Sequence, residues 1–125
     1  MTKKIMLDAN FLIDIFRFRI DLDLLDNLIE DSFSFETTSS VKKELLKISK
    51  RSSKEGSFAK LALKIIEIKK VNIIKSKEFS GDASILENIS KETMVATIDL
   101  KLRKTLKRLG IKTIYLRSKK RLEIG

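Results

Sequence analysis

The chain has 125 residues, of which 42% are hydrophobic and 35% charged, and its formal net charge is +10. This length favours one domain over residues 1–125, which can bury roughly two-thirds of the surface that the unfolded chain exposes. The chain has no Cys and no His, which excludes disulfides, thiolate and zinc sites and imidazole catalysis; any metal must therefore be held by oxygen ligands, which favours Mg²⁺ or Mn²⁺.

Short apolar runs alternate with amphipathic segments along the chain. The pattern predicts a strand at 4–7 (KIML), helical pieces at 10–20 and 21–31, a second strand at 33–38 and a helix at 39–50. A loose polar connection follows at 50–57, then a helix at 58–70, a strand at 71–75, a helix at 82–91, a strand at 94–97, a basic helix at 100–110, a strand at 111–116 and a basic tail. Strands separated by helices imply crossover connections, so the predicted fold class is α/β with a mostly parallel sheet and helices on both faces.

Two helix ends carry local signals. Ser39 or Ser40 is expected to cap the helix that follows the second strand, and Gly110 is expected to end the basic helix.

Nothing in the sequence indicates a membrane or an export signal. No apolar run approaches the roughly 20 residues of a membrane span, and a strand pattern begins directly after the first residues, so no signal peptide is visible. We therefore expect a cytoplasmic protein without a membrane partner.

Acidic residues fall where a parallel sheet would bring them to one edge. Asp8 and Asp99 lie at or just beyond the ends of the first and fourth strands, Asp82 begins the helix after the third strand, and Glu44 lies a few residues into the helix after the second. Ligands bind outside the carboxyl ends of the strands in such sheets, so these carboxylates are expected to converge there. Their joint placement, in a chain of net charge +10, indicates a divalent metal that faces a polyanion.

Each acid also has a simpler explanation. Asp8, Asp82 and Asp99 can each be a helix N-cap. Glu44 is not explained as a capping-box partner, because the candidate caps before it place other residues at the N3 position. A solvated surface glutamate remains its alternative.

The basic residues concentrate near the end of the chain. Residues 101–121 hold ten Lys and Arg and no acid, whereas acids outnumber bases seven to four in residues 1–31. Such a stretch is either a solvated helix face or a surface that contacts phosphates. The candidates for RNA binding are Lys101, Arg103, Lys104, Lys107 and Arg108.

Four segments resemble the PIN-domain family, a small nuclease fold also related to the catalytic core of flap endonucleases. They are 4–16 (KIMLDANFLIDIF), 39–48 (SSVKKELLKI), 81–89 (GDASILENI) and 95–117 (VATIDLKLRKTLKRLGIKTIYLR), in the family's order. The resemblance spans nearly the whole chain. It implies a three-layer α/β/α fold with a mostly parallel five-stranded sheet of order 3-2-1-4-5.

The resemblance also implies a metal site and a reaction. Its four acids, which would hold one or two Mg²⁺ or Mn²⁺ ions, are Asp8, Glu44, Asp82 and Asp99. Asn10 and Thr97 match positions that help to order the site, whereas Ala83 stands where the family often has a further acid, which would weaken a second metal site. The implied reaction is hydrolysis of RNA phosphodiesters to 5′-phosphate and 3′-hydroxyl ends.

Within the family, residues 111–124 resemble archaeal single-domain proteins related to the PIN nuclease that processes small-subunit ribosomal RNA. The resemblance to VapC-type toxin ribonucleases, which an antitoxin partner silences, is looser. A non-catalytic RNA-binding factor in ribosome assembly is a further alternative, against which the intact acid set argues. The RNA target, the metal count and the oligomeric state, a homodimer included, stay open.

Two other enzyme classes fit poorly. A phosphatase with an aspartyl nucleophile would need a second Asp two positions after Asp8, where Asn10 stands. Dinucleotide binding would need a glycine-rich turn after the first strand, and the segment DANFLI has none.

Overall fold

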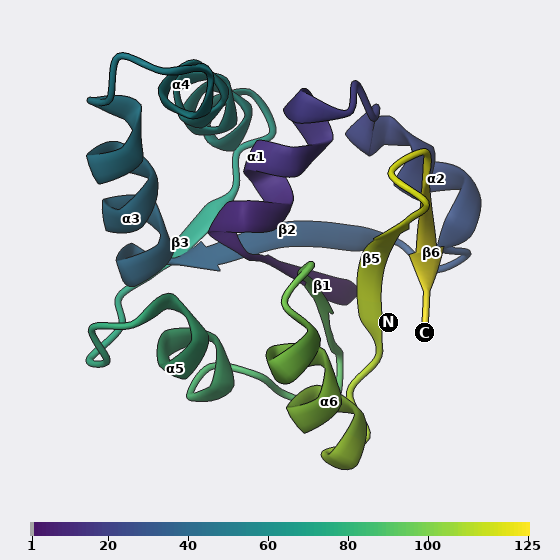
Figure 1. Cartoon of the computed structure of the whole chain (residues 1–125). Coiled ribbons are helices and arrows are strands. Elements are labelled where there is room, and N and C mark those ends of the chain that lie inside the picture. The colour runs from purple at the N-terminus through teal and green to yellow at the C-terminus, as the bar shows by residue number, and fades with distance from the viewer. Residues whose placement is uncertain (1) are drawn as a thin grey trace.

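The computed structural model describes residues 2–125 and contains a six-stranded sheet of order β3-β2-β1-β4-β5-β6 (Figure 1). The strands are β1 (Lys3–Leu7), β2 (Phe33–Thr38), β3 (Asn72–Ile74), β4 (Thr93–Ala96), β5 (Thr113–Arg117) and β6 (Arg121–Ile124). The first five strands pair in parallel, and β6 pairs antiparallel to β5. The predicted order 3-2-1-4-5 is confirmed for these five.

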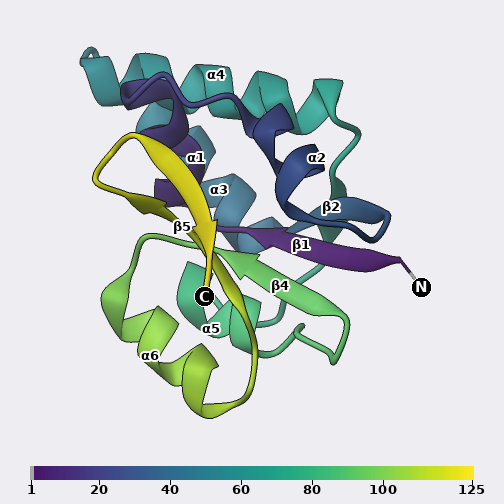
Figure 2. The same cartoon turned by 90° about the vertical axis from the view of Figure 1, so that its right-hand side faces the viewer.

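Helices cover both faces of the sheet. They are α1 (Ala9–Arg17), the 3₁₀ turn η1 (Leu22–Leu24), α2 (Leu25–Leu28), α3 (Ser39–Ser49), α4 (Lys54–Ile68), α5 (Gly81–Leu86) and α6 (Leu100–Arg108). Figures 1 and 2 show α1, α3 and α4 on one side of the sheet and α5 and α6 on the other, which confirms the three-layer α/β/α arrangement. No helix in residues 2–125 is both long and apolar enough to cross a membrane.

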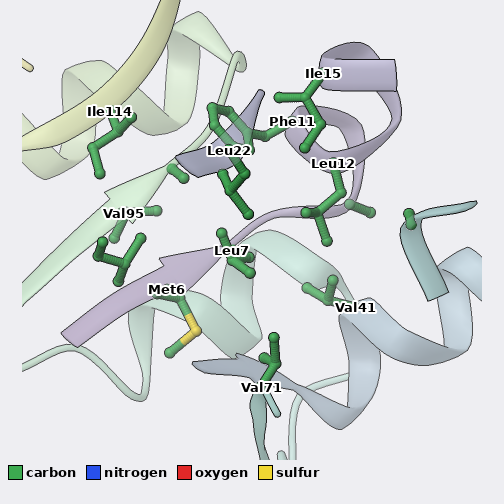
Figure 3. Close-up of a cluster of buried hydrophobic side chains, with 14 of the residues drawn as sticks. Met6, Leu7, Phe11, Leu12, Ile15, Leu22, Val41, Val71, Val95 and Ile114 are labelled. Atoms are coloured by element: carbon green, nitrogen blue, oxygen red, sulfur yellow. The ribbon is translucent and has the colours of Figure 1, made fainter. Parts of the chain in front are cut away.

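The central strand β1 carries the core on both of its faces. Ile5, Met6 and Leu7 are all fully buried, as expected for a parallel strand between two helical layers. Around it pack Phe11 and Leu12 of α1 together with apolar side chains of the neighbouring strands and helices (Figure 3). This packing fixes the direction of β1, and hence the position at which the chain leaves the sheet at Asp8.

The predicted basic tail is instead a hairpin. Ser118 and Lys119 both have positive φ, 54° and 57°, which is the backbone of a type I′ turn, and β6 then returns along β5. A sequence pattern does not reveal this turn, because type I′ turns favour Asn and Gly at these positions. On the hairpin, Glu123 pairs with Arg117 at 3.2 Å and accepts a hydrogen bond from the hydroxyl of Tyr115. The hairpin also gives β5 a neighbour on its outer edge.

Several predicted element boundaries were wrong. The helix predicted at 82–91 ends at Leu86, and the one predicted at 10–20 ends at Arg17. The region 21–31 forms only η1 and α2, because Ile29 turns to an extended conformation that leads into β2. The predicted loop 50–57 is shorter than expected, because α4 begins at Lys54. The Ser53 hydroxyl caps this helix by accepting a hydrogen bond from the Gly56 amide. Glu55, in the first turn of α4, lies 2.8 Å from Arg17 of α1, so a contact between distant segments supports this helix start.

The cap of α3 is Thr38, which accepts a hydrogen bond from the Val41 amide at 3.1 Å, and not Ser39 or Ser40. The end of α6 follows the prediction. Gly110 has φ +77°, and the amides of Gly110 and Ile111 bond to the carbonyls of Lys107 and Leu106, which is a Schellman motif.

Candidate active site

Asp8 lies at the centre of the acidic edge. It follows β1 directly and caps α1, so its side chain, only 4% exposed, is fixed between the sheet and the first helix. One carboxylate oxygen accepts a hydrogen bond from the Ala9 amide at 2.9 Å, and the other accepts one from the Thr97 hydroxyl at 2.8 Å. Both oxygens of this carboxylate are therefore held in place.

Thr97 connects Asp8 to Asp99. It is fully buried just beyond the end of β4, and its hydroxyl oxygen accepts a hydrogen bond from the Asp99 amide at 3.1 Å while donating to Asp8. Asp99 caps α6, since one of its oxygens accepts hydrogen bonds from the amides of Lys101 and Leu102 at 2.8 and 3.1 Å. The expected role of Thr97 in ordering the site thus has a geometric basis, and the N-cap explanation holds for Asp8 and Asp99 as well.

Glu44 and Asp82 approach Asp8 from the helices α3 and α5. Gly81, the first residue of α5, lies so close that a Cβ atom there would be 3.3 Å from Oε2 of Glu44 and 3.9 Å from Oδ1 of Asp8. Asp82 is not the N-cap of α5, because the Ser80 hydroxyl accepts the hydrogen bond from the Ala83 amide at 3.1 Å. The N-cap explanation therefore fails for Asp82. Glu44 and Asp82 are partly covered by their neighbours and still open to solvent.

A hydroxyl contact that the sequence did not indicate holds α5 against the sheet. The hydroxyls of Thr38 and Ser84 lie 2.6 Å apart in a buried contact between the end of β2 and the second turn of α5. Ser84 also donates to the carbonyl of Gly81 at 2.7 Å. These bonds position Asp82, and their only sequence signal is a hydroxyl residue at the end of a strand and another two residues after Asp82.

Burial and mutual repulsion raise the pKa values of three of the acids. The pKa of Asp8 rises from 3.8 to about 6, chiefly through burial and further through the charges of Asp82 and Glu44, although the Thr97 and Ala9 hydrogen bonds oppose this. Burial and then the charge of Asp82 raise the pKa of Glu44. Burial and then the proximity of Asp99 raise the pKa of Asp82, which the charge of Lys101 partly offsets. Asp82 thus interacts with each of the other three acids.

The donor chemistry of this edge fits a divalent cation. Among residues 2–125, none of the four carboxylates forms an ion pair with Lys or Arg. In the same part of the chain, no three acidic side chains are arranged to enclose one ion. Mg²⁺ does not require such a cage, since it usually keeps several waters and binds through one or two carboxylates together with substrate phosphates.

Asn10, Lys101 and Arg103 differ in the contacts that they make near this edge. Asn10 is exposed in the first turn of α1, and within residues 2–125 its side chain forms no hydrogen bond. Lys101 lies near enough to Asp82 to affect its pKa. The guanidinium of Arg103 stacks 3.7 Å from the ring centre of Tyr115, so part of its surface is already covered.

The other predicted RNA contacts line the outer surface of α6. Lys104 and Lys107 border a groove of about 380 Å³ between α6 and β5, together with Leu100, Arg103 and Tyr115. Arg108 lies beside them and is exposed. The groove begins at the first turn of α6, next to Asp99, so a polyanion that occupies it would lead to the acids.

A second cavity, of about 290 Å³, lies at the opposite edge of the sheet. It is bordered by Lys3, Ile29 and Lys112, among others, and none of its lining residues is a predicted site residue. The acids and the basic groove therefore define the candidate site.

Known proteins share this fold and sequence pattern. Residues 5–119 match a family model described as a PIN like domain. The chain is 32% identical to ribonuclease VapC4 of Methanocaldococcus jannaschii, across 97% of this chain and 95% of that protein. It also superposes on the structure of the PIN domain endonuclease Utp24 with a TM-score of 0.80 and 20% sequence identity, covering 97% of this chain and 90% of that one.

Proposed function

The chain belongs to the PIN-like domain family, and from this premise we propose that it is a divalent-metal-dependent endoribonuclease. The observation that carries the proposal is the edge at which Asp8, Glu44 and Asp82 meet while none of them forms an ion pair with a Lys or Arg of residues 2–125. A relative that matches almost the whole chain is a ribonuclease. The proposed catalytic and metal-binding set is Asp8, Glu44, Asp82 and Asp99.

The acids would have different roles in the reaction. Thr97 and the Ala9 amide hold the carboxylate of Asp8, and the amides at the start of α6 hold one oxygen of Asp99, so both acids provide fixed oxygens. Mg²⁺ or Mn²⁺ bound there supplies positive charge to the phosphate and lowers the pKa of water. Glu44 and Asp8 both lie beside Gly81, so the Glu44 carboxylate would bind the ion or accept the proton of the attacking water there. In-line attack of the water oxygen on the phosphorus would break the P–O3′ bond, so that the phosphate stays on the 5′ end of one product and the departing 3′ oxygen takes a proton from solvent to become a hydroxyl.

The basic surface of α6 would hold the flanking RNA. The exposed residues Lys104, Lys107 and Arg108 offer positive charge beside the groove that starts near Asp99. Lys101, next to Asp82, would contact the phosphates nearest to the acids. Such contacts depend on charge and are not specific for sequence.

The test is cleavage of a single-stranded RNA with Mg²⁺ or Mn²⁺, followed by analysis of the product ends. We expect Asp8→Asn and Asp99→Asn each to abolish cleavage while thermal melting shows that the fold survives. Asp26→Asn, which removes an exposed carboxylate on α2, serves as the matched control and should keep full activity. Full activity in EDTA, or in both site variants, would contradict the proposal. RNA binding without any cleavage would favour the non-catalytic alternative.

Two biological roles fit this activity. We propose processing of a ribosomal RNA precursor as the first, on the resemblance of residues 111–124. A toxin ribonuclease with an antitoxin partner is the second candidate, favoured by the likeness to ribonuclease VapC4. Growth arrest on induced expression, absent with Asp8→Asn and relieved by a small protein encoded next to this gene, would identify the toxin. Accumulation of unprocessed small-subunit RNA on depletion would identify the processing enzyme.

A further inference from the structure

A phenylalanine is held in solvent beside the acidic edge. Phe79 is 97% exposed and lies in the segment 75–80, which joins β3 to α5. Scattered exposed apolar residues are common on protein surfaces and need no explanation by themselves. The exposure of Phe79 needs an explanation because of the contacts that surround it.

The segment that carries Phe79 is fixed by hydrogen bonds from its flank. The carboxylate of Glu87, at the end of α5, accepts hydrogen bonds from the hydroxyl of Ser76 at 2.5 Å and from the amides of Lys77 and Glu78 at 3.0 and 3.3 Å. A single carboxylate thus ties three consecutive residues to the helix that carries Asp82.

The start of α3 holds the same segment from the other side. The Ser39 hydroxyl accepts a hydrogen bond from the Ser76 amide at 2.9 Å, and the Ser40 hydroxyl donates to the carbonyl of Glu78. Anchors therefore lie on both sides immediately before Phe79, and the Ser80 cap of α5 lies immediately after it. The ring is exposed because the backbone holds it there.

Gly81, two residues after Phe79, limits how far Phe79 can lie from the acids. Gly81 approaches both Glu44 and Asp8, with 3.3 Å and 3.9 Å from the position of a Cβ atom to their carboxylate oxygens. Two residues of extended chain span at most about 7 Å. Phe79 therefore lies at the rim of the acidic edge, close enough to meet a nucleotide next to a phosphate that the acids hold.

The lack of an apolar patch around the ring favours a nucleic acid over a protein. Lys75 and Lys77 are exposed on either side of Ser76, and Glu78 and Ser80 directly flank the ring, so there is no contiguous apolar patch in this segment. Protein docking generally uses larger apolar patches. Binding of single-stranded nucleic acid needs only an aromatic face for a base and nearby positive charges for the backbone.

We propose that Phe79 is a stacking platform for an unpaired nucleobase next to the cleaved phosphate, with Lys75 and Lys77 beside it for the backbone. The inference rests on the proposed ribonuclease function and makes it more specific. The RNA must be single-stranded at the cleavage position, because a base in a duplex cannot offer its face to the ring. Glu87 is a positioning residue in this arrangement, since it acts through the backbone that carries Phe79.

The test compares Phe79→Ala, Phe79→Trp and the matched control Ile68→Ala, which truncates a 70% exposed residue on α4. The chain has no Trp, so Phe79→Trp introduces a single tryptophan whose emission reports stacking. The probes are a short single-stranded oligoribonucleotide, an abasic oligomer of the same length and a duplex of the same sequence. Binding is measured in the Asp8→Asn background, in which the RNA is not expected to be cut, and cleavage in the wild-type background.

We expect Phe79→Ala to weaken single-strand binding and to lower kcat/KM by about 5- to 150-fold, the range for one stacked base. The dependence of binding on salt should not change, because no charge is removed. Phe79→Trp should bind like wild type, and the single-stranded RNA but not the abasic oligomer should quench its emission. Ile68→Ala should change nothing.

Three results would overturn the inference, and they are distinguishable. If wild type cuts RNA and Phe79→Ala binds and cuts equally well, the stacking role is wrong and the ribonuclease function stands. If Phe79→Ala leaves RNA binding intact but weakens self-association in sedimentation, the ring belongs to a protein contact. If wild type neither binds nor cuts RNA, the proposed function fails and the inference fails with it.

Discussion

The charge of Asp8 should destabilise the metal-free protein at neutral pH. Its pKa in the folded state is about 6, raised from 3.8 mainly by burial, so folding favours the protonated carboxyl. At about 1.4 kcal/mol per pH unit, the difference corresponds to about 3 kcal/mol. This stabilisation is fully present below pH 3.8, is lost as the pH rises through about 6 and is absent at pH 7.5.

Asp8→Asn removes the charge and retains most of the shape. The asparagine has only one acceptor oxygen, so it can keep the bond from the Ala9 amide or the one from the Thr97 hydroxyl, but not both unchanged. Loss of one such bond costs about 1 kcal/mol. We therefore expect the metal-free variant to be more stable than wild type by about 1–3 kcal/mol at pH 7.5, or about 3–6 °C in Tm per kcal/mol for a chain of this size.

The assay is thermal melting of both proteins in EDTA between pH 4.5 and 7.5. Comparing the two proteins separates Asp8 from other carboxyls with raised pKa values, such as Asp14 and Glu36. The advantage of Asp8→Asn should shrink or reverse toward pH 4.5, and Asp26→Asn should show no such trend. Mg²⁺ should stabilise wild type more than Asp8→Asn. A stability difference between wild type and Asp8→Asn that is the same at both ends of this range would refute the reasoning.

Further variants test the remaining features of the site. Thr97→Val should lower kcat and shift its pH profile to higher pH, because loss of the Thr97 hydrogen bond raises the pKa of Asp8. Thr97→Ser, which keeps the hydroxyl, should retain most activity; an active Thr97→Val beside an impaired Thr97→Ser would mean that the methyl packing matters instead. Asp82→Asn should raise the metal-free Tm by a few degrees, because it removes repulsion with the other three acids. No cap is lost, since Ser80 and not Asp82 caps α5; a clear loss of stability in melting curves would contradict this. Replacing Lys104, Lys107 and Arg108 by Gln should weaken RNA binding equally across sequences and flatten the log–log salt slope by up to roughly 0.7 per lost contact. An unchanged slope would show that this surface is only solvated.

Local patterns in the sequence determined the architecture. Continuous apolar runs such as residues 4–7 predicted parallel strands buried on both faces, and alternation with helices predicted the three layers. Once the sheet is parallel, the ends of β1 and β4 must lie at one edge, so Asp8 and Asp99 meet there. The order 3-2-1-4-5 came from family resemblance, because pattern alone does not choose among strand orders.

The tertiary structure decided which side chains hold the acids and how the chain ends. The bonds from Thr97 to Asp8, between Thr38 and Ser84 and from the 76–78 segment to Glu87 join residues that the sequence does not pair. The β5–β6 hairpin likewise depends on a turn without its usual residues. Such features leave no periodic signal, because a single hydrogen bond between distant positions requires only one suitable atom on each side. The sequence therefore determines where the carboxylates emerge, and only the packed fold determines how rigidly each is held and that Phe79 is presented beside them.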